Sequence, residues 1–175
     1  MIVVSDTTPL ISLMKIGQLE LLEKMFGEIV IPDAVYNELT SNEDFAGEAE
    51  AIKNSNFIKR VSIKERRVVD VLQRATGLDL GESEAIVYSD ENKADLLMMD
   101  ESSGRRVAKQ MNIPVIGTIG ILELANSRGI LSADEIKNCV DILRTNRRYI
   151  SEELLQHLLG GFGILSRKSF PGSEP

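Results

Sequence analysis

The sequence predicts an α/β fold in which a central parallel sheet of four or five strands is flanked by helices. Short apolar runs and amphipathic stretches alternate along the whole chain, which is typical of strands joined by helical crossovers. No internal repeat or linker divides the sequence. The 175 residues, of which 43% are hydrophobic, are sufficient for the core of one ordinary domain.

The predicted strands are short apolar runs bounded by polar or turn-forming residues. Pro32 closes the second run, and the third alternates apolar and basic residues, which suggests an edge strand or an extended arm. Asp100 follows the fourth run directly. In chain order, the predicted strands cover residues 3–5, 28–31, 57–63, 94–99 and 113–116.

The predicted helices follow these strands and begin or end at residues with known terminal preferences. Thr8 and Pro9 form a good N-cap and first-turn pair, and Asp33 can cap the next helix. Gly17 interrupts the first helical stretch, and Gly77 ends a later one. The predicted helices cover residues 9–26 with that interruption, 34–39, 64–76, 81–88, 105–111 with a start at Ser102 or Ser103, 117–127 and 133–144.

The end of the chain differs in composition from the rest. Residues 161–175 are rich in Gly, Ser and Pro, which favours a mobile C-terminal tail. The folded domain is therefore expected to span residues 1–160.

The composition disfavours several kinds of site. The single histidine, His157, lies in an amphipathic stretch and is expected to be a surface or packing residue, which argues against a Ser-His-Asp triad. The single cysteine, Cys139, cannot form a disulfide framework or a zinc cluster and is expected to be a small core residue.

The net charge of −7 argues against broad nucleic-acid binding through a basic surface, but it suits an active site made of carboxylates. No apolar stretch approaches 18 residues, so no membrane span is predicted. The sequence also begins without the pattern of a signal peptide, and a cytoplasmic location is the simplest expectation.

Acidic residues occupy positions that parallel-sheet geometry brings together. Asp6 and Asp100 each follow a predicted strand, and the carboxyl ends of parallel strands share the edge of the sheet where ligands bind. Glu38, Glu82 and Glu84 lie on helices that can face the same edge. Carboxylates that converge repel one another, and a divalent cation such as Mg²⁺ or Mn²⁺ removes this repulsion.

Other interpretations of these acids remain open at this point. Asp6 can simply cap the helix that follows it, and Glu82 and Glu84 can be ordinary glutamates at a helix start, where the helix dipole favours negative charge. A pocket that binds one structural cation is a further possibility.

The chain resembles the PIN-domain family, and in particular a branch of uncharacterised, predicted nucleic-acid-binding proteins related to VapC-type toxins. The resemblance covers roughly residues 1–160. Each motif is short, but their order and spacing together are specific. The motifs are Val4-Ser5-Asp6-Thr7-Thr8-Pro9-Leu10-Ile11 and the segments 31–39, 78–86, 97–101, 104–108 and 115–122.

The resemblance implies a three-layer nuclease fold that cleaves RNA with Mg²⁺ or Mn²⁺ held by three or four acids. Carried over to this sequence, Asp6 is the first acid, Glu38 the second and Asp100 the fourth. The third is Glu82 or Glu84, where many relatives have aspartate; Glu82 is favoured by its spacing from Asp100. Two residues two positions apart on a helix point in different directions, so only one is expected to be a direct ligand.

Hydroxyl and basic residues near these acids suggest how a substrate would be held. The hydroxyls of Thr7 and Thr118 can orient ligands or a phosphate, or can serve only as local caps. The basic residues Arg105, Arg106 and Lys109 can contact an RNA backbone or form a solvated helix face.

The leading functional prediction is a metal-dependent endoribonuclease, plausibly the toxin of a type II toxin–antitoxin pair. An antitoxin protein and a homodimeric partner are implied by the same resemblance. The alternative is a non-catalytic RNA- or protein-binding module with the same fold. A receiver-like domain ranks last, because the strand ending at Ile116 is followed by Gly117 and Thr118 rather than by lysine.

Overall fold

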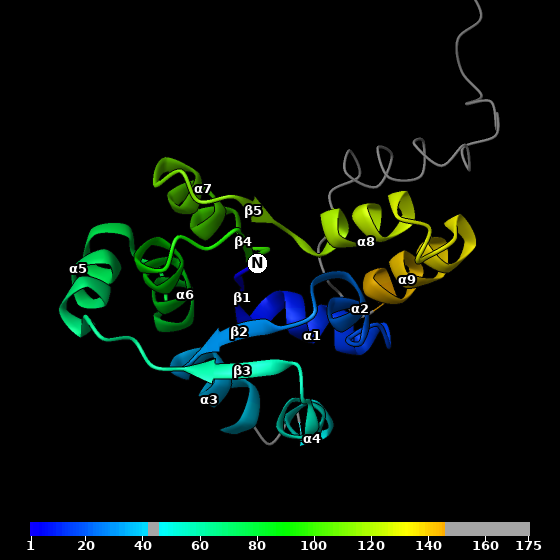
Figure 1. The fold of residues 1–175 in the computed structure, drawn as a ribbon, viewed down its shortest axis with the longest axis horizontal. Coiled ribbons are helices and arrows are strands. Elements are labelled where there is room, and N and C mark those ends of the chain that lie inside the picture. Colours follow the sequence, from blue (N-terminus) through cyan, green and yellow to red (C-terminus); the bar gives the residue numbers. More distant parts are fainter. Residues whose placement is uncertain (42–45, 146–175) are drawn as a thin grey trace, which may run out of the picture. The chain divides into compact units, whose positions relative to one another are not determined.

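A five-stranded sheet organises the protein. The computed structural model describes residues 1–41 and 46–145, and the chain divides into two compact units, Met1–Ile121 and Leu122–Pro175. All pairings in the sheet are parallel and the strand order is β3-β2-β1-β4-β5 (Figure 1), which confirms the predicted α/β class. The strands are β1 (Val3–Ser5), β2 (Ile29–Pro32), β3 (Ile58–Val61), β4 (Leu96–Met98) and β5 (Val115–Ile116).

Helices connect these strands, and two more follow the last strand in sequence. All but α4, which was not among the predicted helices, lie close to predicted positions. Residues 42–45 lie outside the described part of the chain. The helices are α1 (Thr7–Lys15), α2 (Leu21–Phe26), α3 (Asp33–Ser41), α4 (Ala46–Asn54), α5 (Arg66–Thr76), α6 (Leu80–Glu91), α7 (Ser102–Gln110), α8 (Thr118–Ser127) and α9 (Ala133–Thr145).

The strand order places a switch point between β1 and β4. The chain moves from β1 outward to β2 and β3, then crosses back to β4 and continues to β5 in the opposite direction. Val4 is paired with Leu97, Ser5 with Met98, and the Asp6 N–H donates to the Met98 carbonyl at 3.0 Å. Ligands of open α/β sheets bind outside the carboxyl ends of the strands at such a point, so the end of β1 is the natural place for a site.

The face of the sheet beneath α6 and α7 carries a hydrophobic core cluster. Alternating strand positions point to one face, so Val4, Leu97 and Met99 contribute to it together. Helix α6 packs against β1, β2 and β4, and α5 in turn packs on α6 (Figure 1). The other buried members are Leu78, Ala85, Ile86, Ala94, Val107, Ala108 and Ile113.

Several helix starts differ from the sequence-based prediction. Helix α1 begins at Thr7 with Asp6 as its N-cap, so Thr8 is not the cap; Pro9 is still tolerated because first-turn N–H groups have no partner within the helix. Asp33 is the first residue of α3 rather than its cap. Helix α6 is capped by Asp79 and not opened by Gly81, whereas α5 ends at left-handed Gly77 as predicted.

The second unit contributes α9, which begins with a reciprocal cap. The Ser132 N–H donates to Glu135 at 2.8 Å, and the Glu135 N–H donates back to the Ser132 hydroxyl at 3.3 Å. Cys139 is buried on this helix, as predicted, and burial raises the pKa of its thiol. Residue His157 and the predicted tail at 161–175 lie outside the described residues. No helix in the described ranges has both the length and the apolar character needed to cross a membrane.

Candidate functional site

Asp6 is a buried carboxylate at the carboxyl end of β1. Its residue is 3% exposed, and its backbone is still extended as the chain enters α1. Burial raises the pKa of Asp6 to about 7; the Thr7 backbone N–H opposes the rise, and the negative charges of Asp79, Glu82 and Glu38 add to it. Asp6 is therefore a buried carboxylate with three other acids near it.

Three carboxylates converge on the first turn of α6. A Cβ atom placed on Gly81 would lie 3.5 Å from each of Asp6 Oδ1, Asp79 Oδ1 and Glu38 Oε2, so any two of these oxygens lie within twice that distance. Glycine at this position keeps the helix surface open where the oxygens meet. The Thr7 hydroxyl donates to Glu38 Oε2 at 2.7 Å and so holds the glutamate at this place.

Glu82 adds a fourth carboxylate and is locked to Asp79 by a capping box. Asp79 Oδ1 accepts from the Glu82 N–H at 2.8 Å, and Glu82 Oε2 accepts from the Asp79 N–H at 3.1 Å. Burial raises the pKa of Glu82; its bond from the Asp79 N–H opposes the rise, and the charges of Asp79, Glu101 and Glu38 add to it. Its second oxygen, Oε1, is buried without a hydrogen-bond partner in the described part of the chain.

The cluster formed by Asp6, Glu38, Asp79 and Glu82 has a buried floor and an exposed rim, and we call it the acidic cluster. Asp6 and Glu82 are buried, while Glu38 and Asp79 are exposed. A solute can therefore reach the cluster from the side of the rim. An orphaned buried carboxylate oxygen is costly unless a cation or donor approaches it.

Asp100 lies on the neighbouring strand connection, as predicted, but its side chain has other partners. Asp100 Oδ1 accepts from the Thr118 N–H at 2.7 Å and Oδ2 accepts from the Thr118 hydroxyl at 2.6 Å. The pairing of Ser5 with Met98 puts Asp6 level with Met99, whose side chain faces α6 and α7. Thr118 thus donates to both Asp100 oxygens, and Asp100 is not among the three carboxylates whose oxygens lie nearest a Cβ placed on Gly81.

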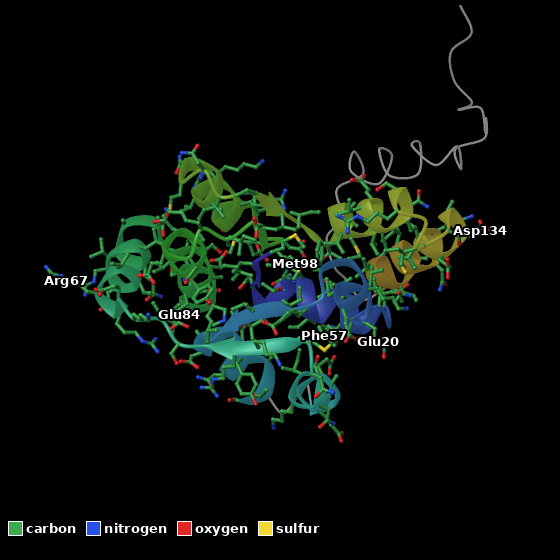
Figure 2. The ribbon with its side chains drawn as sticks, viewed as in Figure 1. Glu20, Phe57, Arg67, Glu84, Met98 and Asp134 are labelled. Carbon is green, nitrogen blue, oxygen red and sulfur yellow. The ribbon has the colours of Figure 1, made fainter. Side chains whose placement is uncertain are left out.

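Glu84 is also separated from the acidic cluster. It is 0% exposed and lies on the side of α6 toward the ends of β2 and β3 (Figure 2). Its Oε2 accepts from the Ala34 N–H at 2.9 Å, and its Oε1 accepts from the Arg66 guanidinium. Of the two candidates for the third acid, Glu82 is therefore the one that the structure brings to Asp6 and Glu38.

A family model described as a PIN domain (DUF3368) matches residues 2–163 of the chain. The chain belongs to the PIN-domain family. This finding confirms the family resemblance drawn from the motifs, and with it a nuclease-type fold. The comparison with curated proteins and the comparison with solved structures each found no match.

A basic cavity of this PIN domain lies along α7, and Asp100 is the acid in its wall. It has a volume of about 570 Å³, and Arg105, Arg106 and Lys109 supply three positive charges to its wall. Arg105 also donates to the Met99 carbonyl at 2.9 Å, which fixes the side chain beside Asp100. The remaining lining residues are Ser102 and Gln110.

Asp79 is the member of the acidic cluster that was not among the predicted site residues. An aspartate before a helix is ordinarily explained as a cap, and Asp79 is one. The available signal was the spacing Asp79-x-x-Glu82 just before an apolar run, which is typical of a capping box. In this PIN domain the same two carboxylates cap α6 and face Asp6.

The acidic cluster fits a divalent cation that keeps part of its water. In the described ranges 1–41 and 46–145, no three acidic, histidine or cysteine side chains are close enough to hold a metal ion directly. Mg²⁺ is commonly bound through one or two carboxylates with several waters retained, so three ligands at bonding distance are not required. The unpaired Glu82 oxygen and the raised pKa of Asp6 both indicate negative charge that a cation would stabilise.

Proposed function

We propose that this PIN domain is a metal-dependent endoribonuclease that hydrolyses RNA phosphodiester bonds at the acidic cluster. The observation that carries the proposal is the convergence of Asp6, Asp79 and Glu38 on Gly81. Glu82 follows Gly81 on the same helix, its charge raises the pKa of Asp6, and one of its buried oxygens is unpaired. Four neighbouring carboxylates repel one another, and such a destabilising arrangement is typical of functional sites.

The residues of the acidic cluster have different roles in this proposal. Asp6 and Glu82 on the buried floor, with Glu38 on the rim, would hold Mg²⁺ or Mn²⁺, in part through waters that the ion retains. The bound ion supplies charge neutralisation at the phosphodiester and a more acidic water. Thr7 keeps Glu38 in place through its hydroxyl, and Asp79 is kept in place by the Glu82 N–H.

Asp100 and Thr118 have a structural role in this proposal. The carboxylate of Asp100 accepts two bonds from Thr118 and so sets the start of α8 next to the site. The cations of the basic cavity, Arg105, Arg106 and Lys109, would contact the RNA backbone through its phosphates. In this proposal the substrate contacts and the Asp100 carboxylate lie on neighbouring elements, since α7 begins two residues after Asp100.

RNA cleavage with a matched pair of variants tests the proposal. Asp6→Asn removes one carboxylate from the floor of the cluster, whereas Asp134→Asn removes the same charge from an exposed position on α9. We expect cleavage of a mixed single-stranded RNA in Mg²⁺ or Mn²⁺ by the parent and by Asp134→Asn, and at least a hundredfold slower cleavage by Asp6→Asn, the order of a lost catalytic group.

The alternative, a non-catalytic binding module, predicts another outcome. Such a protein would bind RNA equally well with and without Asp6 and would show no calorimetric signal with millimolar Mn²⁺. Equal cleavage by the parent and Asp6→Asn would show instead that any nuclease activity in the preparation comes from elsewhere.

We further propose that the protein acts in the cytoplasm as the toxin of a toxin–antitoxin pair, with a homodimer as its working form. The support is the similarity of its motifs to those of VapC-type toxins. Induced expression should arrest growth with the parent and not with Asp6→Asn, and co-expression of the product of an adjacent small gene should restore growth. Growth unaffected by the active parent would contradict the toxin role without affecting the nuclease assignment.

A further inference from the structure

Glu84 connects α6 to the beginning of α3, and Glu38 lies one turn further along α3. We propose that Glu84 is a positioning residue, not a metal ligand: its carboxylate holds α3 against α6 so that Glu38 reaches the acidic cluster. The effect of Glu84 on catalysis rests on the proposed function, whereas its effect on the position of α3 does not. Its structural basis is the bond from the Ala34 N–H to Glu84 Oε2 at 2.9 Å.

Two matched contacts fix the relation between the helices. Ala34 and Glu38 are four positions apart on α3 and therefore share a face, and Gly81 and Glu84 share a face of α6 at a spacing of three. Ala34 meets Glu84, and Glu38 approaches Gly81. The first contact sets the position of α3, and the second brings the Glu38 carboxylate to the cluster.

The chemistry of the contact between Glu84 and the Ala34 N–H suits a residue that holds α3 against α6, and we call this contact the clamp. The N–H groups of a helix's first turn have no partner within the helix, and Ala34 is the second residue of α3. A carboxylate that accepts from such an N–H makes a charge-assisted bond favoured by the helix dipole. Glu84 is fully buried, and Arg66 supplies the positive charge that makes a buried carboxylate tolerable.

The contacts of Glu84 argue against a role as a metal ligand. Both Glu84 oxygens already accept a bond, one from a backbone amide and one from a guanidinium. Arg66 also pairs with Asp33, the neighbour of Ala34, so Glu84 and Asp33 share this guanidinium. A second cation would have to displace Arg66.

Calorimetry with Mn²⁺ on Glu84 variants separates positioning from ligation. Glu84→Leu removes the acceptor for the Ala34 N–H, and we expect Mn²⁺ affinity to fall by about 10–100-fold, as for supporting residues of metal sites. Glu84→Gln keeps an oxygen that can accept the Ala34 N–H, so its Mn²⁺ affinity should be clearly closer to that of the parent than the affinity of Glu84→Leu is. The control is Glu91→Gln, an exposed position on the same helix. The proposal would be overturned if Glu84→Gln and Glu84→Leu lost Mn²⁺ affinity equally, and by as much as Glu38→Gln does.

Arg66→Met gives an independent test because the two roles predict opposite signs. A ligand released from its guanidinium would bind Mn²⁺ at least as tightly as before, whereas a clamp that loses its supporting charge would position Glu38 less well and weaken binding. Arg67→Met is the matched control, since Arg67 points away from α5 into solvent (Figure 2). Binding equal to or tighter than that of the parent would refute the clamp.

Amide hydrogen exchange in metal-free protein tests the clamp without the nuclease function. We expect the Ala34 amide and its neighbours at the start of α3 to exchange faster in Arg66→Met and in Glu84→Leu than in the parent, with α9 unchanged as internal reference. Unchanged exchange at Ala34 in both variants would overturn the clamp. Absence of Mn²⁺ binding by the parent would instead overturn the proposed function and leave this measurement valid.

Discussion

Asp6→Asn is predicted to stabilise the metal-free protein while it abolishes cleavage. The parent must bury a carboxylate that is 3% exposed and surrounded by acids, and this raises the pKa of Asp6 from 3.8 to about 7. A pKa shift of this size corresponds to a free energy on the order of 4 kcal/mol. Asparagine has nearly the same shape, carries no charge and keeps an oxygen that can accept the Thr7 N–H.

The pH dependence follows from the direction of this shift. The folded protein binds the Asp6 proton more tightly than the unfolded chain does, so the free energy of unfolding decreases as the pH rises from about 4 to about 7, by about 1.4 kcal/mol per unit. Below that window both states are protonated and no penalty exists. The advantage of asparagine is therefore small near pH 4 and reaches its full size, on the order of 4 kcal/mol, at pH 8.

Urea unfolding in the presence of a chelator, at pH 5 and pH 8, measures this advantage. Asp134→Asn is the control for loss of one negative charge, because Asp134 is exposed on α9. Millimolar Mg²⁺ should then stabilise the parent more than Asp6→Asn, since only a ligand bound by the folded state raises its stability. An Asn variant that is less stable than the parent at pH 8, or a difference that is the same at both pH values, would refute the reasoning.

Three further predictions concern neighbouring parts of the site. Lys109→Gln should weaken RNA binding about equally for all sequences and reduce the slope of log affinity against log salt by about 1, as measured by fluorescence anisotropy. Thr118→Val should lower the free energy of unfolding in urea by about 1–3 kcal/mol, because the Asp100 carboxylate loses its hydroxyl donor. Gly104→Ala should destabilise the protein by about 1–3 kcal/mol in the same assay, since its Cβ would lie 2.3 Å from the Met99 sulfur; an unchanged midpoint would show that this methionine moves aside freely.

The sheet and the approximate position of the site could be predicted from the sequence because both depend on local pattern. Short apolar runs ending at polar residues located all five strands, and residues 3–5 were predicted with the bounds of β1. An acid after a strand lies at the ligand-binding edge by topology alone. For this reason Asp6 could be assigned to that edge from the sequence alone, and the structure brings Glu38 and Glu82 into its neighbourhood. Their role as a functional site stays a prediction.

The direction of individual side chains could not be predicted in the same way. Asp100 and Met99 are adjacent, and only the register with β1 shows which of them faces α6. Glu82 and Glu84 lie on one helix turn, and only their partners distinguish them: Asp79 for the first, Ala34 for the second. Contacts between residues distant in sequence leave no periodic signal, so the spacing from Asp100 could favour Glu82 but could not exclude Glu84.

The bond between the Ala34 N–H and Glu84 joins residues 50 positions apart, and this has a consequence for folding. The first turn of α3 is completed by a side chain synthesised long after α3 itself, and contacts of large sequence separation form late because the intervening loop must close first. If Glu84 positions α3 as proposed, the contact that places Glu38 can form only after the chain has been synthesised through α6. If the acidic cluster is a nuclease site, a nascent chain gains its activity only when α6 has left the ribosome and docked.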